Sequence, residues 1–154
     1  MRPEGYMVWV DGDPAAQGSK KLVRLKNGRS VMLENSKRVK PWRTAVAEAA
    51  REWKVQPYVG DVMLHVRVRF VRPQKHYRKD GTITPGAPAR PGYADCDKLA
   101  RAICDALAGI AYANDRQVAA IAIEREWSPE GMGSGAIIRI VPCPPKGGWA
   151  YEHP

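Results

Sequence analysis

The hydrophobic and polar positions in the first part of the chain predict a strand followed by a hairpin. Residues Tyr6 to Asp11 contain four consecutive apolar side chains and are expected to form a strand. Two short runs that alternate apolar and polar residues, near 21–26 and 29–33, flank the dipeptide Asn27-Gly28. An Asn-Gly pair between such runs is a strong hairpin signal, because both residues tolerate the positive φ angles of a tight turn.

The next segment has the spacing of an amphipathic helix. Pro41 is expected to open this helix, since proline lacks only an N–H that would have no partner in the first turn. The helix is predicted to run to about Lys54. Its buried face is predicted to consist of Trp42, Ala45, Val46, Ala49 and Trp53.

Residues Val62 to Arg72 show the clearest strand pattern, because apolar residues occupy every second position. The opposite face carries a row of three nitrogen-bearing side chains, His65, Arg67 and Arg69. This row is either solvated or placed to face phosphate groups. A second helix is expected from about Lys98 to Ala108.

Two further strands, near 117–127 and 136–141, complete the predicted elements. The order is strand, hairpin, helix, long strand, irregular segment, helix and two strands. This order is typical of a mixed α/β (α+β) fold with one mixed sheet and two main helices packed on it. The 154 residues suit a single small domain, 1–154, with one core, and residues 142–154 are expected to form a loose tail.

The composition excludes several classes of protein. Hydrophobic residues make up 44% of the chain, enough for a folded core, and no apolar run is long enough to cross a membrane. The N-terminal residues lack the layout of a signal peptide, so a cytoplasmic location is expected. The three cysteines, Cys96, Cys104 and Cys143, have no CxxC spacing and are expected to be reduced thiols rather than disulfides or zinc ligands.

Positive charge is concentrated in two stretches of a chain whose net charge is +9. Residues 20–43 contain nine Lys or Arg and one acid, and residues 62–94 contain seven Lys or Arg and one acid. From Asp95 onward, eight acidic residues face six basic ones. Clustered positive charge favours a polyanionic partner such as nucleic acid, although a solvated surface that aids solubility would have the same composition.

Residues 73–93 form one long irregular segment rich in proline and glycine. A loop of this length in a compact domain is usually functional or disordered, and the sequence leaves both interpretations open. Its first part mixes positive charge with an aromatic ring, which suits contact with unpaired or distorted nucleic acid. The residues concerned are Lys75, His76, Tyr77, Arg78 and Lys79.

Two aspartates, Asp95 and Asp97, flank one cysteine at the start of the second predicted helix. If both are extended, their side chains point the same way and could share a hard cation such as Mg²⁺. The free N–H groups at the start of a helix also attract phosphate. Asp115 is a candidate third carboxylate if its loop returns it to this place. From the residues alone, a helix cap at Asp97 and turns at Asp95 and Asp115 are the simpler interpretation.

The spacing of these acids resembles a family signature. The stretch DCDKLARAICDAL, followed by GIAYANDRQV, is similar to the pattern of the RusA family of Holliday-junction resolvases: D-x-D-[NK]-L, a helix ending D-A-L, then a glycine, an aromatic residue, a [DN]-D pair and Q-V. Upstream, QGSKKLVRLKNGRSVMLENSKRVKPWRTAVAEAA and KHYRKDG resemble the phage-type branch of that family. The resemblance covers most of the chain, from Val8 to Val141, and the block from Asp95 to Val118 is its most specific part.

This resemblance implies a homodimeric, Mg²⁺-dependent endonuclease that acts on four-way DNA junctions, with Mn²⁺ as a substitute metal and no small-molecule cofactor or membrane partner. The metal-binding aspartates of the family correspond to Asp95, Asp97 and Asp115. The family's catalytic lysine falls on Arg101, which can hold a phosphate but cannot readily donate a proton, so Lys98 is a second candidate for that role. Asp105 matches the family's helix aspartate and is expected to support Arg101.

Three functional hypotheses fit these observations. The first is the junction-resolving nuclease, whose DNA backbone contacts are expected from Lys20, Lys21, Lys37, Arg38, Arg67, Arg69 and the basic loop residues 75–79. The second is a non-catalytic nucleic-acid-binding protein, in which the acids only cap a helix and form turns. The third keeps the chemistry of the first but acts on flaps, replication forks or D-loops. Mg²⁺-dependent cleavage separates the second hypothesis from the other two.

Overall fold

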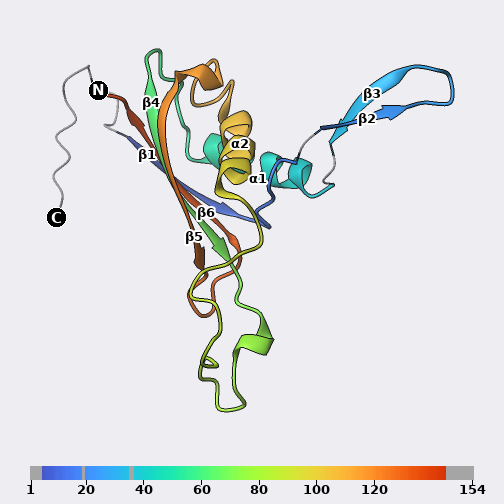
Figure 1. Cartoon of the computed structure of the whole chain (residues 1–154). Coiled ribbons are helices and arrows are strands. Elements are labelled where there is room, and N and C mark those ends of the chain that lie inside the picture. The colour runs from blue at the N-terminus through green and yellow to red at the C-terminus, as the bar shows by residue number, and fades with distance from the viewer. Residues whose placement is uncertain (1–4, 19, 35–36, 145–154) are drawn as a thin grey trace.

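The computed structural model describes residues 5–18, 20–34 and 37–144, except for the side chains at 20–23 and 32–34. A four-stranded sheet in the order β1-β6-β4-β5 is the centre of the fold, and two α-helices cover one of its faces (Figure 1). This arrangement confirms the predicted α+β class with one mixed sheet and two main helices.

The sheet joins the two ends of the described chain. Strand β1 (Tyr6–Asp11) pairs antiparallel with β6 (Gly135–Pro142), and β6 also pairs antiparallel with β4 (Val62–Phe70). Strand β5 (Val118–Trp127) lies parallel to β4 at the other edge. Parallel neighbours need a crossover connection, and α2 supplies it between β4 and β5.

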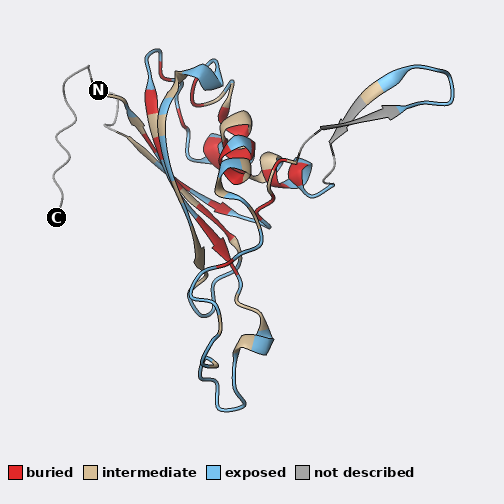
Figure 2. Ribbon diagram, in the orientation of Figure 1, coloured by how far each residue is buried: buried red, intermediate tan, exposed pale blue. Residues whose placement is uncertain are grey.

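The helices α1 (Val39–Glu52) and α2 (Cys96–Leu107) lie side by side on the sheet. Their apolar faces meet the inward-facing residues of β1, β4 and β6, as the buried positions in Figure 2 show. The predicted alternation of β4 is confirmed, because its apolar residues at alternate positions are all buried. One core results, and its largest fully buried side chains include Trp42, Tyr112, Leu64 and Leu99.

The predicted hairpin forms a sheet of its own. Strands β2 (Lys20–Arg24) and β3 (Ser30–Glu34) pair with each other and extend away from the helices (Figure 1). Gly28 in their turn has φ +81°, a conformation that glycine adopts without the steric cost of a side chain. The hairpin with its turn at Asn27-Gly28 is therefore confirmed, although residues 25–29 separate the two strands, which were expected to reach 26 and to resume at 29.

Two predictions about the first helix are wrong. The helix starts at Val39, before Pro41, so the proline lies within its first turn instead of opening it. Trp53 follows the last helical residue and is 50% exposed, whereas Ala50 is fully buried in the place expected for the tryptophan. The helix ends before Trp53 can continue the apolar stripe.

Within the described part of the chain, no helix is both long and apolar enough to span a membrane. Of the expected tail, Cys143 donates its backbone N–H to the Asp61 carbonyl oxygen at 2.8 Å, and residues 145–154 lie outside the described residues.

Candidate active site

The two neighbouring aspartates lie at the amino end of α2, although not as predicted. Asp95 is the N-cap residue, with extended backbone angles, and its carboxylate makes no capping hydrogen bond. Asp97 lies within the first helical turn, so the two are not both extended and Asp97 is not the cap. Both residues are exposed. The helix dipole favours negative charge here, and in the part of the chain that the structure describes the Asp97 carboxylate makes no hydrogen bond or ion pair.

Two basic residues stand next to this carboxylate pair. The Nζ atom of Lys98 lies 3.2 Å from Oδ2 of Asp95, in a pair whose side chains are 42% and 69% exposed. An exposed ion pair contributes at most about 1 kcal/mol, so a competing cation or anion can separate its partners. Arg101 follows one turn later, is exposed, and makes no ion pair with any residue that the structure describes. Its guanidinium is therefore open to bind an anion.

The third aspartate lies at the opposite end of the helix. Asp115 begins the short helix η2 (Asp115–Gln117), directly before β5. The pKa of the Cys104 thiol is raised to about 11, mainly by burial and to a smaller extent by the charges of Asp105 and Asp115. Asp115 is thus close to Cys104, which lies nine residues, or about 14 Å of helix, beyond Asp95.

Gln117 fixes this third aspartate in place. Its side-chain nitrogen donates to the carbonyl oxygens of Tyr58 and Gly60 at 2.9 and 2.8 Å. Its side-chain oxygen accepts from Ala113 N–H, at 2.9 Å, and from Asn114 N–H, so that Asn114 and Gln117 form a capping box around Asp115. The sequence motif contains this glutamine, but the motif alone gave no reason for its presence.

The prediction that a loop returns Asp115 to Asp95 is wrong for a single copy of the chain. In the described ranges, no three His, Cys, Asp or Glu side chains gather in a way that could hold a metal ion. Asp95 and Asp97 nevertheless fit Mg²⁺ by donor type, since this ion usually takes one or two protein carboxylates and fills its other positions with water and phosphate oxygens.

The comparison with protein families is decisive at this point. The model of the family described as endodeoxyribonuclease RusA matches residues 11–140 of the chain. The chain belongs to this family. A search of curated proteins finds no match. Membership identifies the chain as a DNA-hydrolysing enzyme, which disfavours the hypothesis of a non-catalytic DNA-binding protein.

Asp105 of this RusA-family chain does not contact Arg101 through an ion pair in the described structure. It lines a hollow of about 470 Å³ between the two helices, opposite Lys40, Arg43 and Arg51 of α1. Its predicted support of Arg101 stays a prediction.

The structure describes the long segment 73–93 throughout. It contains the short helix η1 (Gln74–His76), and Arg78 N–H donates to the Thr82 carbonyl oxygen at 2.7 Å across a tight turn. The segment extends beyond the end of the sheet (Figure 1). Lys75, Tyr77, Arg78 and Lys79 are exposed along it, which suits the predicted backbone contacts.

Trp127, at the end of β5, holds this segment against the sheet. Its Nε1 donates to the Pro88 carbonyl oxygen at 2.9 Å, and the Arg72 guanidinium lies 4.8 Å from the centre of its ring. The rings of His76 and Tyr93 meet it edge-on at 5.5 and 5.7 Å. His76, predicted to bind DNA, is therefore part of a packed aromatic cluster. The strand pattern of 117–127 gave no sign of this role for Trp127.

The row of basic residues on β4 divides into different environments. Arg67 is exposed and bonded to Glu126 at 2.7 Å, a hydrogen bond that raises its pKa. The predicted DNA contact of Arg69 is wrong, because this residue is 2% exposed. Its guanidinium lies 5.6 Å from the ring of Trp9 and donates to the sulfur of Met132. The alternation of the strand could not reveal that another strand and a turn cover that position.

The other predicted DNA contacts lie around the start of α1. Lys37 and Arg38 are exposed there. Lys20 and Lys21 belong to β2, but their side chains lie outside the described residues.

Arg125 is a further residue that the motif did not identify. Its Nη1 donates to the carbonyl oxygen of Ala94, the residue directly before Asp95. This bond ties the carboxylate pair to the last part of β5.

Proposed function

We propose that this chain is a Mg²⁺-dependent endodeoxyribonuclease that resolves four-way (Holliday) DNA junctions by paired hydrolysis of two phosphodiester bonds, in DNA recombination and repair. Mn²⁺ is expected to substitute for Mg²⁺. The observation that carries the proposal is the exposed pair Asp95 and Asp97, with Lys98 and Arg101 beside it, at a helix start in a chain of net charge +9.

In this proposal, Asp95 and Asp97 hold the divalent ion and Arg101 binds a non-bridging oxygen of the scissile phosphate. The bound ion lowers the pKa of water and offsets negative charge on the phosphate. If Asp95 held the ion, the Lys98 Nζ that now pairs with it would be free to lie at the phosphate and donate a proton to the leaving oxygen, while the attacking water would give its proton to the solvent. Arg101 neutralises the charge that develops, a role its permanently charged guanidinium suits.

The third carboxylate, Asp115, comes from a second copy of the chain in this proposal. Strand β5 is a sheet edge with no fully buried residue, and Ala119, Ile121 and Ala122 are exposed along it. A long apolar edge of this kind pairs readily with another strand. Asp115 lies at the start of β5, and Arg125 ties Asp95 to its end.

Antiparallel pairing of β5 with its copy about a twofold axis exchanges these ends. Asp115 of each copy then approaches Asp95 and Asp97 of the other, so that one dimer has two equivalent sites. Two equivalent sites suit a junction, which is resolved productively by nicks in two like strands. The basic loop residues Lys75, Arg78 and Lys79 would grip the DNA backbone on both sides of such a dimer.

The direct test is cleavage of an end-labelled synthetic four-way junction in Mg²⁺. We expect Asp97→Asn to cut at least about a hundredfold more slowly than the parent, because one of the ion's few protein ligands is weakened. Glu48→Gln, which changes an exposed carboxylate on α1, is the matched control. Equal rates for Asp97→Asn and the parent would exclude the metal-holding role.

The shared site has a separate test by mixing variants. Asp97→Asn and Asp115→Asn should each be inactive when assayed alone. In an equal mixture, half of the dimers contain one copy of each variant, and each of these dimers has one intact site of two. The mixture should therefore recover about a quarter of the nicking activity of the parent. Separate sites within each copy predict no recovery. Flaps, replication forks and D-loops belong in the same assay, because a faster rate on one of them would replace the four-way junction as the substrate. We place this activity in the cytoplasm of a bacterium or a phage-infected host, as the resemblance to the phage-type branch implies.

A further inference from the structure

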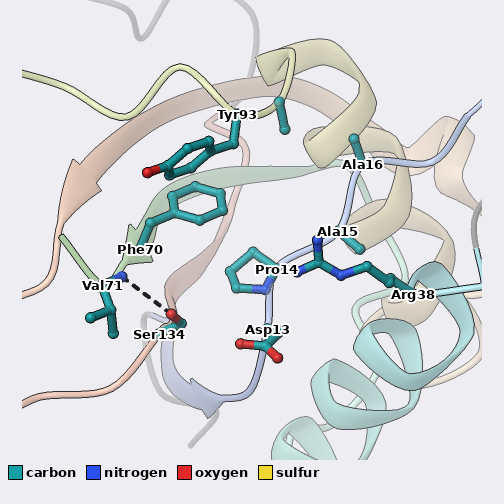
Figure 3. A pocket seen from close by; sticks show the side chains of 10 residues that line it. Asp13, Pro14, Ala15, Ala16, Arg38, Phe70, Val71, Tyr93 and Ser134 are labelled. Atoms are coloured by element: carbon teal, nitrogen blue, oxygen red, sulfur yellow. Dashed lines mark hydrogen bonds between the residues drawn. The ribbon is translucent and has the colours of Figure 1, made fainter. Parts of the chain in front are cut away.

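A cavity of about 610 Å³ has Ala94, the residue directly before Asp95, in its lining, and Figure 3 shows the cavity from close by. Its walls come from the segment after β1, the end of β4 and the two residues before Asp95, which are Tyr93 and Ala94. Gln17 N–H donates to the Lys98 carbonyl oxygen at 3.1 Å, which holds the first of these walls against the start of α2. Its volume lies within the roughly 300–1,000 Å³ of typical small-ligand sites.

Aromatic rings form one side of this cavity. The Tyr93 ring meets the rings of Phe70 and Trp127 edge-on, each at 5.7 Å. Tyr93 is nevertheless 59% exposed, so its ring is fixed by two neighbours and still presents open surface. An aromatic ring that is already fixed loses little conformational entropy when a ligand stacks on it, which favours binding.

Polar groups form the other side. Figure 3 shows Asp13, Pro14 and Arg38 across the cavity from the rings of Phe70 and Tyr93. Neither Asp13 nor Arg38 makes an ion pair or a side-chain hydrogen bond with another residue in the part of the chain that the structure describes. A carboxylate and a guanidinium therefore offer an unused acceptor and unused donors opposite an aromatic surface.

We propose that this cavity binds one unpaired nucleobase of the branched DNA, taken from the position next to the scissile phosphate. The proposal rests on the proposed function, since that function brings branched DNA to Asp95. A flat heteroaromatic ring with donors and acceptors on its edge matches an aromatic wall facing Asp13 and Arg38. Ala94, which lines the cavity, is the residue directly before Asp95.

Capture of a base would also favour branched over continuous duplex DNA. Bases at a crossover are less well stacked, so moving one into the cavity costs less there than inside a duplex. Continuous duplex DNA would bind the same basic surface but would place no base in the cavity. Selectivity for a branch would then come from the cavity and not from the net charge.

The test is a binding cycle between protein and DNA, without divalent metal so that nothing is cut. A synthetic four-way junction is prepared intact and with one abasic site at each position next to the crossover, in separate molecules. We expect one position at which base removal weakens binding to the parent by about tenfold, the order of magnitude of one base–aromatic stack. Tyr93→Ala should lose as much on the intact junction, and little more on that abasic junction.

Three further variants keep the test sharp. Tyr93→Phe keeps the ring and should show the parent pattern. Trp53→Ala removes a ring at the far end of α1 that is 50% exposed, against 59% for Tyr93, and should also bind like the parent. Val71→Trp places a larger side chain at the cavity rim, where Val71 is 53% exposed. By occupying the space meant for the base, it should weaken binding of the intact junction as Tyr93→Ala does, without removing a buried group.

Two results would overturn the inference. The first is that Tyr93→Ala binds the intact junction as tightly as the parent does. The second is that, at every position, the fold-loss of affinity from base removal multiplies the fold-loss from Tyr93→Ala, which would mean that the two changes are independent. Cleavage of the intact junction in Mg²⁺ by the parent keeps the two proposals apart. If the parent cuts but the cycle shows no coupling, only the base pocket fails. If the cycle shows coupling but no branched DNA is cut, only the proposed function fails.

Discussion

Replacing Trp127 with alanine should release the basic segment 73–93 from the sheet while the sheet itself stays folded. The indole is only partly buried, so its loss leaves no large core cavity. What disappears is one hydrogen bond to Pro88, the contact with the Arg72 guanidinium, and two edge-on ring contacts, to His76 and Tyr93. At exposed sites these contribute roughly 1, 0.5 and twice 0.5 kcal/mol, and together about 2.5 kcal/mol.

A loss of about 2.5 kcal/mol from the local closing equilibrium raises the open population about 70-fold. The assay is limited trypsin digestion under native conditions, with fragments identified by mass spectrometry. Cleavage after Lys75, Arg78 and Lys79 should accelerate by about that factor, because proteolysis follows the open population when reclosing is fast. The control is Trp53→Ala, which removes an exposed indole from the end of α1 and should leave these sites unchanged.

The reasoning fails if cleavage of Trp127→Ala at these sites is no faster than cleavage of the parent. It also fails if acceleration occurs equally at sites throughout the sheet, since that would indicate global unfolding. Unfolding in urea, followed by far-ultraviolet circular dichroism, separates the two cases.

Two other predictions concern the far end of α2. Gln117→Ala should lower the free energy of unfolding by about 2 kcal/mol, because the side-chain hydrogen bonds to the backbone of Tyr58, Gly60 and Ala113 are lost. It should also slow junction cutting, because Asp115 is displaced. Gln117→Glu, which keeps the acceptor but not the donor, should fall between Gln117→Ala and the parent in urea unfolding. Burial raises the pKa of Cys104 from 9.0 to about 11, so its contribution to stability is present below pH 9 and is lost as the pH rises through 11. Melting temperatures of Cys104→Ala should therefore fall less steeply than those of the parent between pH 9 and 11; parallel slopes would show that the thiol is not protected from ionisation.

The sequence predicted the sheet and the helices well because their signals are local. Alternation identified β4, and Asn27-Gly28 identified the hairpin turn, since period and turn chemistry depend on a few neighbouring residues. Burial was harder. Arg69 follows the alternation of its strand, but Trp9 covers it from a strand that lies 60 residues away in the sequence. Such contacts become visible only in three dimensions.

The acidic site shows a different limit. The motif placed Asp95, Asp97 and Asp115 together in one predicted site. Their arrangement depends on the crossover: a helix that returns between two parallel strands ends where the second strand begins. Asp115, which precedes β5, therefore lies at the end of α2 and not at its start. Recognising β4 and β5 as parallel would have revealed this from the sequence.

The pairing of β1 with β6 has a consequence for how the chain folds. Tyr6 lies opposite Ile140, so the first strand meets its partner only after most of the chain has been synthesised. Loops that long are entropically costly to close, and proteins dominated by distant contacts fold slowly. During synthesis on the ribosome, the apolar side chains of Val8 and Val10 remain exposed until β6 emerges from the exit tunnel. Chaperone capture of nascent chains should therefore persist until residues 135–142 have left the exit tunnel.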